Sequence, residues 1–310
     1  MLSINRRTTT PSLLQATAAR RPAKAAAPLA ARRLTNRDTA EVLTFLAKRP
    51  LQTVIMAGLI RSYGLDSPLN RGMFYACRDE RGTLEGVALI GHATLLATTT
   101  DRALRAFARL AQTGDCRTHM IMGEEECIRS FWWHYSTSDE RQQMRLACRE
   151  LLFELTHVST AQRLVSGLRP AVPDDLELIL PVQAELAFLE SGVNPLEIDP
   201  VGFRQRTLRR VEKGQTWVLF KDGQLIFKAE VQSETPQVIY LEGIYVRPEA
   251  RGQGYGRRCL SQLCNTLLKR ADSICLLVNE EHTRAHNFYQ QLGFRLRSRY
   301  DTIFLRQRHC

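Results

Sequence analysis

The sequence predicts an α/β protein in which a mixed (α+β) sheet is flanked by helices. In the second half, three successive strand-like segments are followed by a helix, a strand and another helix, and the chain closes on strands. The first half also runs from a strand pair through a helix to a further strand and helix. A β-meander joined to a βαβ unit is typical of a layered α/β fold.

The length and composition are those of a globular protein with about two domains. The chain has 310 residues, 44% hydrophobic and 24% charged, and a domain typically takes about 150 residues. This balance excludes wholesale disorder, collagen-like repeats and coiled-coil architecture. The longest apolar runs, such as 86–91 and 274–278, are far shorter than the ~20 residues that span a bilayer. We therefore expect no membrane association.

The net charge of +11 is concentrated at the N-terminus. Residues 1–37 carry eight of the 43 basic residues and none of the 32 acidic ones, so the remainder is almost neutral. Three prolines interrupt this stretch, and we predict a disordered basic tail over 1–37. An organelle transit peptide and nonspecific contact with nucleic acid are alternatives to a tail without a specific role. Specific nucleic-acid binding is not expected, and nothing in the pattern predicts an oligomeric state.

Eight scattered cysteines form no CxxC pair. Several lie within apolar periodic segments, where a thiol behaves as a small hydrophobic side chain. Reduced core cysteines indicate a cytoplasmic protein.

In the first half, an uncharacterised α/β domain is predicted over 38–160. Asp38 is a good N-terminal cap for its first helix, and Pro50 ends that helix before an apolar segment over 54–60. The further elements expected are strands over 73–77 and 86–96, a helix over 101–110, a strand over 120–122, a helix through 131–135 and a helix over 140–155.

The second domain is predicted over 161–310. The elements expected are helices over 174–189 and 203–211, strands over 217–220, 225–231 and 238–246, a helix over 256–269, a strand over 274–278, a helix over 283–292, and closing strands over 294–297 and 302–305. Both halves share an Asp/Gly turn between strands, so the first could be a degenerate duplicate of the second.

The most informative segment is the loop between the strand that ends at Val246 and the next helix. Gly252, Gly254 and Gly256 allow tight turns that bring backbone N–H groups against an anion, and a helix N-terminus adds partial positive charge. Arg251 can add a charge-assisted contact. The segment predicts a pyrophosphate cradle. A Walker A site is excluded because no Lys-Ser/Thr pair follows, and a Rossmann site lacks its acidic residue about 20 positions later.

These motifs resemble those of the GCN5-related N-acetyltransferase (GNAT) family. The stretch Arg251-x-x-Gly254-x-Gly256, preceded by residues 244–248, is similar to its acyl-CoA loop. Asn279 and then Ala285-x-x-Phe288-Tyr289-x-x-x-Gly293-Phe294 resemble its second signature. The resemblance covers about 168–305.

The resemblance implies a splayed mixed sheet and an N-acetyltransferase that uses acetyl-CoA as co-substrate and a primary amine as acceptor. A non-catalytic acyl-CoA-responsive regulatory protein is the alternative. The residues that it implies for acyl-CoA binding are Ile244, Tyr245, Val246, Arg251, Gly252, Gln253, Gly254, Tyr255, Gly256, Asn279 and Asn287.

Two residues are candidates for proton transfer. In a regular strand Glu242 shares a face with Ile244 and Val246, so it could act as the base that deprotonates the amine. An ion pair with a nearby arginine, or a water chain that carries the proton, is the alternative for Glu242. Tyr289 matches the position from which many members of the family protonate the departing thiolate, although it could serve packing alone.

No metal is expected. His282 and His286 have the i, i+4 spacing of metal ligands but no third ligand nearby in sequence. Glu124, Glu125 and Glu126 are better explained as favourable charges at a helix start.

The first half is similar to an uncharacterised domain that precedes GNAT domains in some bacterial proteins, on the stretches 58–64 and 119–124. Before its helix at Asp101 it has Ala97-Thr-Thr-Thr where the family's glycine loop would fall. We therefore expect that it cannot hold CoA in the same way. It could instead cover the acceptor cleft of the second half, whose specificity we expect from 190–195.

Overall fold

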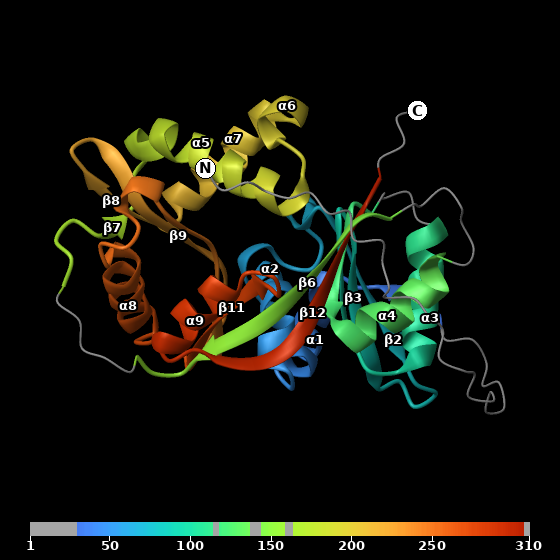
Figure 1. Cartoon of the computed structure of the whole chain (residues 1–310). Coiled ribbons are helices and arrows are strands. Elements are labelled where there is room, and N and C mark those ends of the chain that lie inside the picture. The colour runs from blue at the N-terminus through green and yellow to red at the C-terminus, as the bar shows by residue number, and fades with distance from the viewer. Residues whose placement is uncertain (1–29, 114–117, 137–143, 159–163, 307–310) are drawn as a thin grey trace.

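The computed structural model describes residues 30–113, 118–136, 144–158 and 164–306. These residues form a mixed sheet in the order β1-β2-β3-β4-β5-β12-β6-β11-β10-β9-β8-β7, and helices pack on both faces (Figure 1). The strands are β1 (Arg32–Arg33), β2 (Gly72–Arg78), β3 (Leu84–Gly91), β4 (Ala93–Thr98), β5 (Met120–Glu124), β6 (Met144–Leu155), β7 (Arg169–Pro170), β8 (Thr216–Lys221), β9 (Gln224–Glu234), β10 (Val238–Val246), β11 (Ser273–Asn279) and β12 (Arg295–Leu305). The helices are α1 (Thr39–Leu46), α2 (Pro50–Tyr63), α3 (Asp101–Thr113), α4 (Glu125–Ser136), α5 (Leu176–Ser191), α6 (Pro195–Ile198), α7 (Pro200–Glu212), α8 (Tyr255–Leu267) and α9 (Thr283–Gln291). The predicted mixed α/β fold is confirmed.

The two halves repeat one order of elements. Three antiparallel strands, a helix, a parallel strand, a helix and a long strand run from β2 to β6 and again from β8 to β12. Each half has one parallel strand pair, β4–β5 and β10–β11. The last strand of each repeat, however, lies beside the parallel pair of the other repeat.

This exchange of strands joins the halves into one sheet. β6 pairs with β11 of the second half, and β12 pairs with β5 of the first. The two exchanged strands also pair with each other and run side by side through the middle of the molecule (Figure 1). The predicted boundary at 160/161 falls within 159–163, outside the described residues, and stays a prediction.

Helices cover the sheet on both faces because each strand alternates its side chains between them. In the second half, α8 and α9 pack on one face over Phe153, Leu241 and Leu276. On the opposite face, α2 of the first half contributes Val54 to a cluster with Tyr240. In the first half, α3 and α4 cover one face and α1 and α2 the other. Helix α2 therefore bridges the two halves.

Two predicted elements at the centre of the sheet are wrong. Residues 140–155 were expected as a helix, but 144–155 form strand β6. Leu151, Phe153 and Leu155 face α8, whereas Leu152 faces α2, so both faces of this strand are buried. A run that is apolar on both sides does not distinguish strand from helix by its periodicity. The two predicted closing strands are one continuous strand, β12, with a bulge near 296–298.

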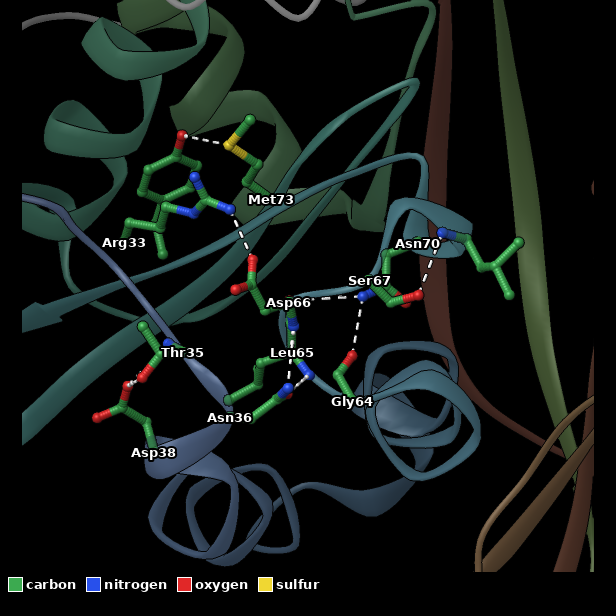
Figure 2. Close-up of polar contacts among 12 residues, drawn as sticks. Arg33, Thr35, Asn36, Asp38, Gly64, Leu65, Asp66, Ser67, Asn70 and Met73 are labelled. Carbon is green, nitrogen blue, oxygen red and sulfur yellow. Dashed lines mark hydrogen bonds and ion pairs between the residues drawn. The ribbon is translucent and has the colours of Figure 1, made fainter.

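Most of the predicted tail, residues 1–29, lies outside the described residues. Its last part is ordered, so the prediction of disorder is wrong for 30–37. β1 pairs with β2. Arg33 donates to Asp66 at 2.6 Å, and the side-chain oxygen of Asn36 accepts from the backbone N–H of Leu65 at 2.7 Å (Figure 2). These contacts fasten the segment to the turn that follows α2.

No helix in the described parts of the chain is both long and apolar enough to cross a membrane.

Candidate functional site

The glycine loop connects β10 to α8 and presents free backbone donors. Gly252 and Gly254 adopt φ values of 78° and 79°, which residues with a Cβ rarely occupy. No acceptor on the described residues pairs with the N–H groups of 252, 253 and 254. The first N–H groups of α8 extend this row because a helix leaves its first turn unpaired. The loop is therefore a row of donors at the positive end of a helix dipole.

Side chains of the loop hold its shape. Arg251 donates from Nε to the carbonyl of Val246 at 3.1 Å, and Gln253 donates to the carbonyl of Glu249 at 2.9 Å. Arg258 stacks over the Tyr255 ring with its guanidinium carbon 5.0 Å from the ring centre. Arg251 thus braces the loop with one nitrogen while its exposed guanidinium adds positive charge there.

Gly256 is required for the packing of α8 against β10. A Cβ at this position would lie 3.1 Å from a methyl carbon of Val246 and 3.5 Å from the ring of Phe288. The absence of a side chain keeps the helix close to the strand end. This contact brings the predicted loop, the strand and the second signature together.

The parallel strands beside the loop separate. β10 and β11 pair at only three positions, which end with Tyr240 opposite Cys275. Beyond that point β11 continues along β6, whereas β10 continues along β9 as far as Val246. The splay places the last residues of β10 without a strand partner on their β11 side.

A β-bulge in β10 changes the expected facing of Glu242. Glu242 lies opposite Glu230 and Tyr245 lies opposite Lys228, so β10 has one extra residue over this stretch. Gly243 provides the bulge with φ of 59°. Ile244 and Val246 pack toward the α8 core. The prediction that Glu242 shares their face is therefore wrong, because the bulge gives Glu242 and Tyr245 a common face instead.

A buried ionic network supports this bulge from β9. Lys228 and Glu230 are both fully buried and form an ion pair at 3.2 Å. Arg210 of α7 contacts the other oxygen of Glu230 at 2.7 Å, and Gln183 of α5 donates to it at 3.2 Å. Lys228 also donates to the carbonyl of Gly243 at 3.4 Å. The sequence did not reveal this network, although Lys228 and Glu230 at i and i+2 within an apolar strand are unusual enough to have suggested it.

Glu242 is a carboxyl group without a partner. No hydrogen bond or ion pair joins its side chain to another described residue. Desolvation raises its pKa, and Glu230 adds to the rise, while Arg210 and Lys228 oppose it. Two further carboxyls lie near enough to interact, Glu190 at the end of α5 and Glu150 of β6. Desolvation raises the pKa of each, and the charge of Glu242 raises it further. Sequence analysis missed Glu150, which belonged to the segment wrongly predicted as a helix.

Tyr289 lies on α9, against the β6 strand. Its ring packs edge-on to Phe288 and Phe294 with centroids 5.2 and 5.7 Å away, and at 6.5 Å from Phe153. Burial raises the pKa of its hydroxyl above the ordinary value. The hydroxyl makes no hydrogen bond to the described residues. The phenol is thus fixed by its ring, remains protonated at neutral pH and is free to donate.

The two predicted asparagines differ in their surroundings. The side-chain oxygen of Asn279 accepts from the backbone N–H of Glu281 at 2.8 Å, and its carbonyl contacts Nε2 of His286 at 2.9 Å. Asn279 therefore shapes the start of α9 and keeps only its amide nitrogen for a ligand. Asn287 is exposed on α9.

Within the described residues, no group of three or more His, Cys, Asp or Glu side chains is arranged to hold a metal ion. His286 is engaged with Asn279, and Glu124 pairs with Arg49.

Comparison with known proteins finds a family match within the second half. Residues 184–294 match the model of the acetyltransferase (GNAT) family. Thialysine N-epsilon-acetyltransferase of Bos taurus is 41% identical over 56 residues, which are 18% of this chain and 33% of that protein. The chain thus matches only about a third of the length of this curated relative.

Two solved structures show the fold over both halves. A Drosophila protein superposes with a TM-score of 0.61 and 14% identity, covering 89% of this chain and 98% of its own. A tandem GNAT protein from the clavulanic acid biosynthesis pathway superposes with a TM-score of 0.54 and 14% identity, covering 89% and 97%. At these identities the likeness is one of fold.

Proposed function

Because residues 184–294 belong to the acetyltransferase (GNAT) family, we propose that the protein is an acetyl-CoA-dependent N-acetyltransferase. An acyl group would pass to a primary amine by direct attack while donor and acceptor are both bound. One observation carries the proposal most strongly. The splay between β10 and β11 adjoins a row of free N–H donors on one side and an unpartnered carboxyl, Glu242, on the other.

The loop fits the donor's pyrophosphate. Gly252 and Gly254 supply backbone donors without a Cβ in the way, and the α8 N-terminus and Arg251 supply positive charge. The exposed amide of Asn287 and the amide nitrogen of Asn279 suit the pantetheine. The donor supplies a thioester, whose carbonyl carbon is the electrophile. Backbone N–H groups of Ile244 and Val246 could polarise that carbonyl, a fixed-donor effect of about 3 kcal/mol per donor.

The proton of the attacking amine would go to Glu242. A raised pKa makes this carboxylate a stronger base than an ordinary glutamate, and it remains ionised where the pH exceeds that pKa. Desolvation raises the pKa of Glu190 to about 8, so this carboxyl is largely protonated at neutral pH. The carboxyls of Glu242, Glu150 and Glu190, to the extent that each is ionised, together create a negative field. Such a field favours an acceptor that arrives as an ammonium cation, and Glu242 would then convert it to the nucleophilic amine.

The departing thiolate would receive its proton from Tyr289. A phenol with a raised pKa holds its proton until a thiolate forms beside it, and the hydroxyl of Tyr289 has no competing acceptor on the described residues. The acceptor would enter over the face covered by α2, α5 and α7, so both halves would shape its specificity. We expect the reaction to take place in the cytoplasm.

The proposal is tested by release of CoA thiol across a panel of amines, with CoA affinity measured separately by calorimetry. Glu242→Gln and Tyr289→Phe should each lower kcat by about 10²-fold or more and leave CoA affinity within twofold. Glu80→Gln, at an exposed position in the turn between β2 and β3, is the matched control and should retain full activity. Acetyl-CoA binding by a wild-type protein that acetylates no amine would refute the enzyme and favour the acyl-CoA-responsive regulatory protein.

A further inference from the structure

A cavity of about 220 Å³ lies between helices α1 and α2 and the centre of the sheet. Its walls come from β4 and β5 of the first half, from the exchanged strands β6 and β12, and from β10 and β11. The lining is mainly apolar, with Val54, Leu95, Met122 and Leu152 among its members. None of the glycine-loop residues contributes to it, so it is a different site from the one proposed for acetyl-CoA.

This cavity opens where the first half has its own splayed strands. β4 and β5 pair in parallel at three positions, which end with Leu95 opposite Met122. β10 and β11 separate after the same number of pairs. The first half has therefore kept the gap between its parallel strands.

The entrance of this gap lacks the features of a phosphate-binding site. Residues 97–100 replace the glycine loop, and the helix that follows begins with Asp101, which is bound to His134 and Arg105. Glu124 lies at the mouth and is neutralised by Arg49. Asp101 thus places a carboxylate at the N-terminus of α3, the position at which a pyrophosphate would have to bind. The gap between β4 and β5 is thus mainly apolar, and it has no loop that could bind the pyrophosphate of CoA.

Two buried tyrosines indicate what else the cavity would take. Tyr240 and Tyr300 line it and are only 7% and 5% exposed. Neither hydroxyl has a hydrogen-bond partner on the described residues, and both residues line the cavity, where a bound molecule or water can reach the hydroxyls. Partners supplied by a bound molecule would satisfy them.

We propose that this cavity binds a neutral small molecule with an aliphatic chain and one hydroxyl or carbonyl group. A cavity of about 150 Å³ holds benzene, so one of about 220 Å³ accommodates about nine heavy atoms in all. The polar group pairs with the hydroxyl of Tyr240 or Tyr300, and the chain packs against the apolar walls. This site does not depend on acetyl transfer.

The test uses straight-chain primary alcohols from butanol to decanol, titrated calorimetrically into the wild-type protein. Affinity should rise about fourfold per methylene as far as octanol and then level off, because longer chains exceed the cavity. Octanoate and octylammonium should bind at least tenfold more weakly than octanol. Saturating CoA should leave octanol affinity unchanged. A rise that continues through decanol, absence of alcohol binding, or displacement of octanol by CoA would each overturn the proposal.

Variants at the cavity wall, with a surface control, test the location of the site. Ala97→Phe places a ring in the cavity and should move the plateau to shorter alcohols, whereas Ala40→Phe, on the exposed side of α1, should leave the series unchanged. One of the two variants Tyr240→Phe and Tyr300→Phe should weaken octanol binding about fivefold through loss of one hydrogen bond, and unchanged binding in both would contradict the proposal. If Ala97→Phe fails to fold, the wild-type chain-length series still decides. An unshifted plateau in a folded Ala97→Phe protein contradicts binding in this cavity.

Discussion

Replacement of Glu230 by Gln should destabilise the protein severely while changing almost no volume. Glu230 is fully buried on β9, where it receives contacts from Lys228 at 3.2 Å and Arg210 at 2.7 Å. The amide of glutamine keeps the shape but removes the negative charge. Lys228 would then be a fully buried cation that has lost its paired anion and contacts only neutral acceptors, such as the carbonyl of Gly243 at 3.4 Å.

The expected loss of folding stability follows from the charge that the substitution leaves without a partner. Loss of one partner from a buried ion pair costs about 3–5 kcal/mol, chiefly because the surviving charge remains without compensation. Lys228→Met should cost less, because Glu230 would still be held by Arg210 and by Gln183 at 3.2 Å. Glu230→Gln should therefore be the more damaging of the two, although it is the smaller chemical change.

The assay is urea-induced unfolding, with Glu212→Gln as the control, since that glutamate is exposed on α7. The deficit of Glu230→Gln should shrink as the pH rises from 7 toward 10. Desolvation already lowers the pKa of Lys228 below its ordinary value of about 10.4, and loss of Glu230 lowers it further. The unfolded chain then binds the proton more readily, so the penalty is full at low pH and fades as Lys228 loses its charge.

Equal stability of Glu230→Gln and Glu212→Gln at pH 7 would refute this reasoning. A loss of unfolding free energy that does not change with pH would also refute it, because such a loss would indicate poorer packing and not an uncompensated charge.

Three other outcomes are expected. The pH profile of kcat/KM should rise through an apparent pKa above the ordinary glutamate value of about 4.3, because the carboxyl of Glu242 must be ionised to act, and Glu242→Gln should abolish that limb. Gly254→Ala should weaken CoA binding about fivefold or more in calorimetry, because φ of 79° costs a residue with a Cβ about 1–2 kcal/mol; unchanged affinity would argue against the loop as the cradle. Gly58→Ala should lower the free energy of unfolding by about 1–3 kcal/mol, because its methyl would collide with Ser233, whose hydroxyl bonds the Val54 carbonyl at 2.7 Å. Addition of Ser233→Ala should recover part of that loss, and failure to do so would place the strain elsewhere.

The conformation of the glycine loop and the start of α8 could be predicted from the local pattern because their signals are short-range. Glycines at 252 and 254 indicate positive φ values. The helix that follows buries Cys259, Leu263 and Leu267 at helical spacing. Both features depend on neighbours in the sequence. Both features are present in the structure because the tertiary contacts are compatible with them.

Features that depend on contacts between residues distant in the sequence could not be predicted from local patterns. The bulge at Gly243 depends on how β10 registers with β9, and a single inserted residue reverses the facing of Glu242 relative to Val246. Residues 144–155 contain good helix formers, yet strand partners on both edges, β11 and β12, decide their conformation. Glu150 was missed for the same reason.

The exchange of β6 and β12 sets a condition on biosynthesis. β6 is complete at Leu155, but its two neighbours begin at Ser273 and Arg295. A growing polypeptide must therefore carry a strand with both hydrogen-bonding edges bare while more than a hundred further residues are made. Such edges invite pairing with other chains. Premature termination ahead of β12 would leave one edge of β5 and one edge of β6 without a strand partner, and a truncated chain should therefore aggregate more readily.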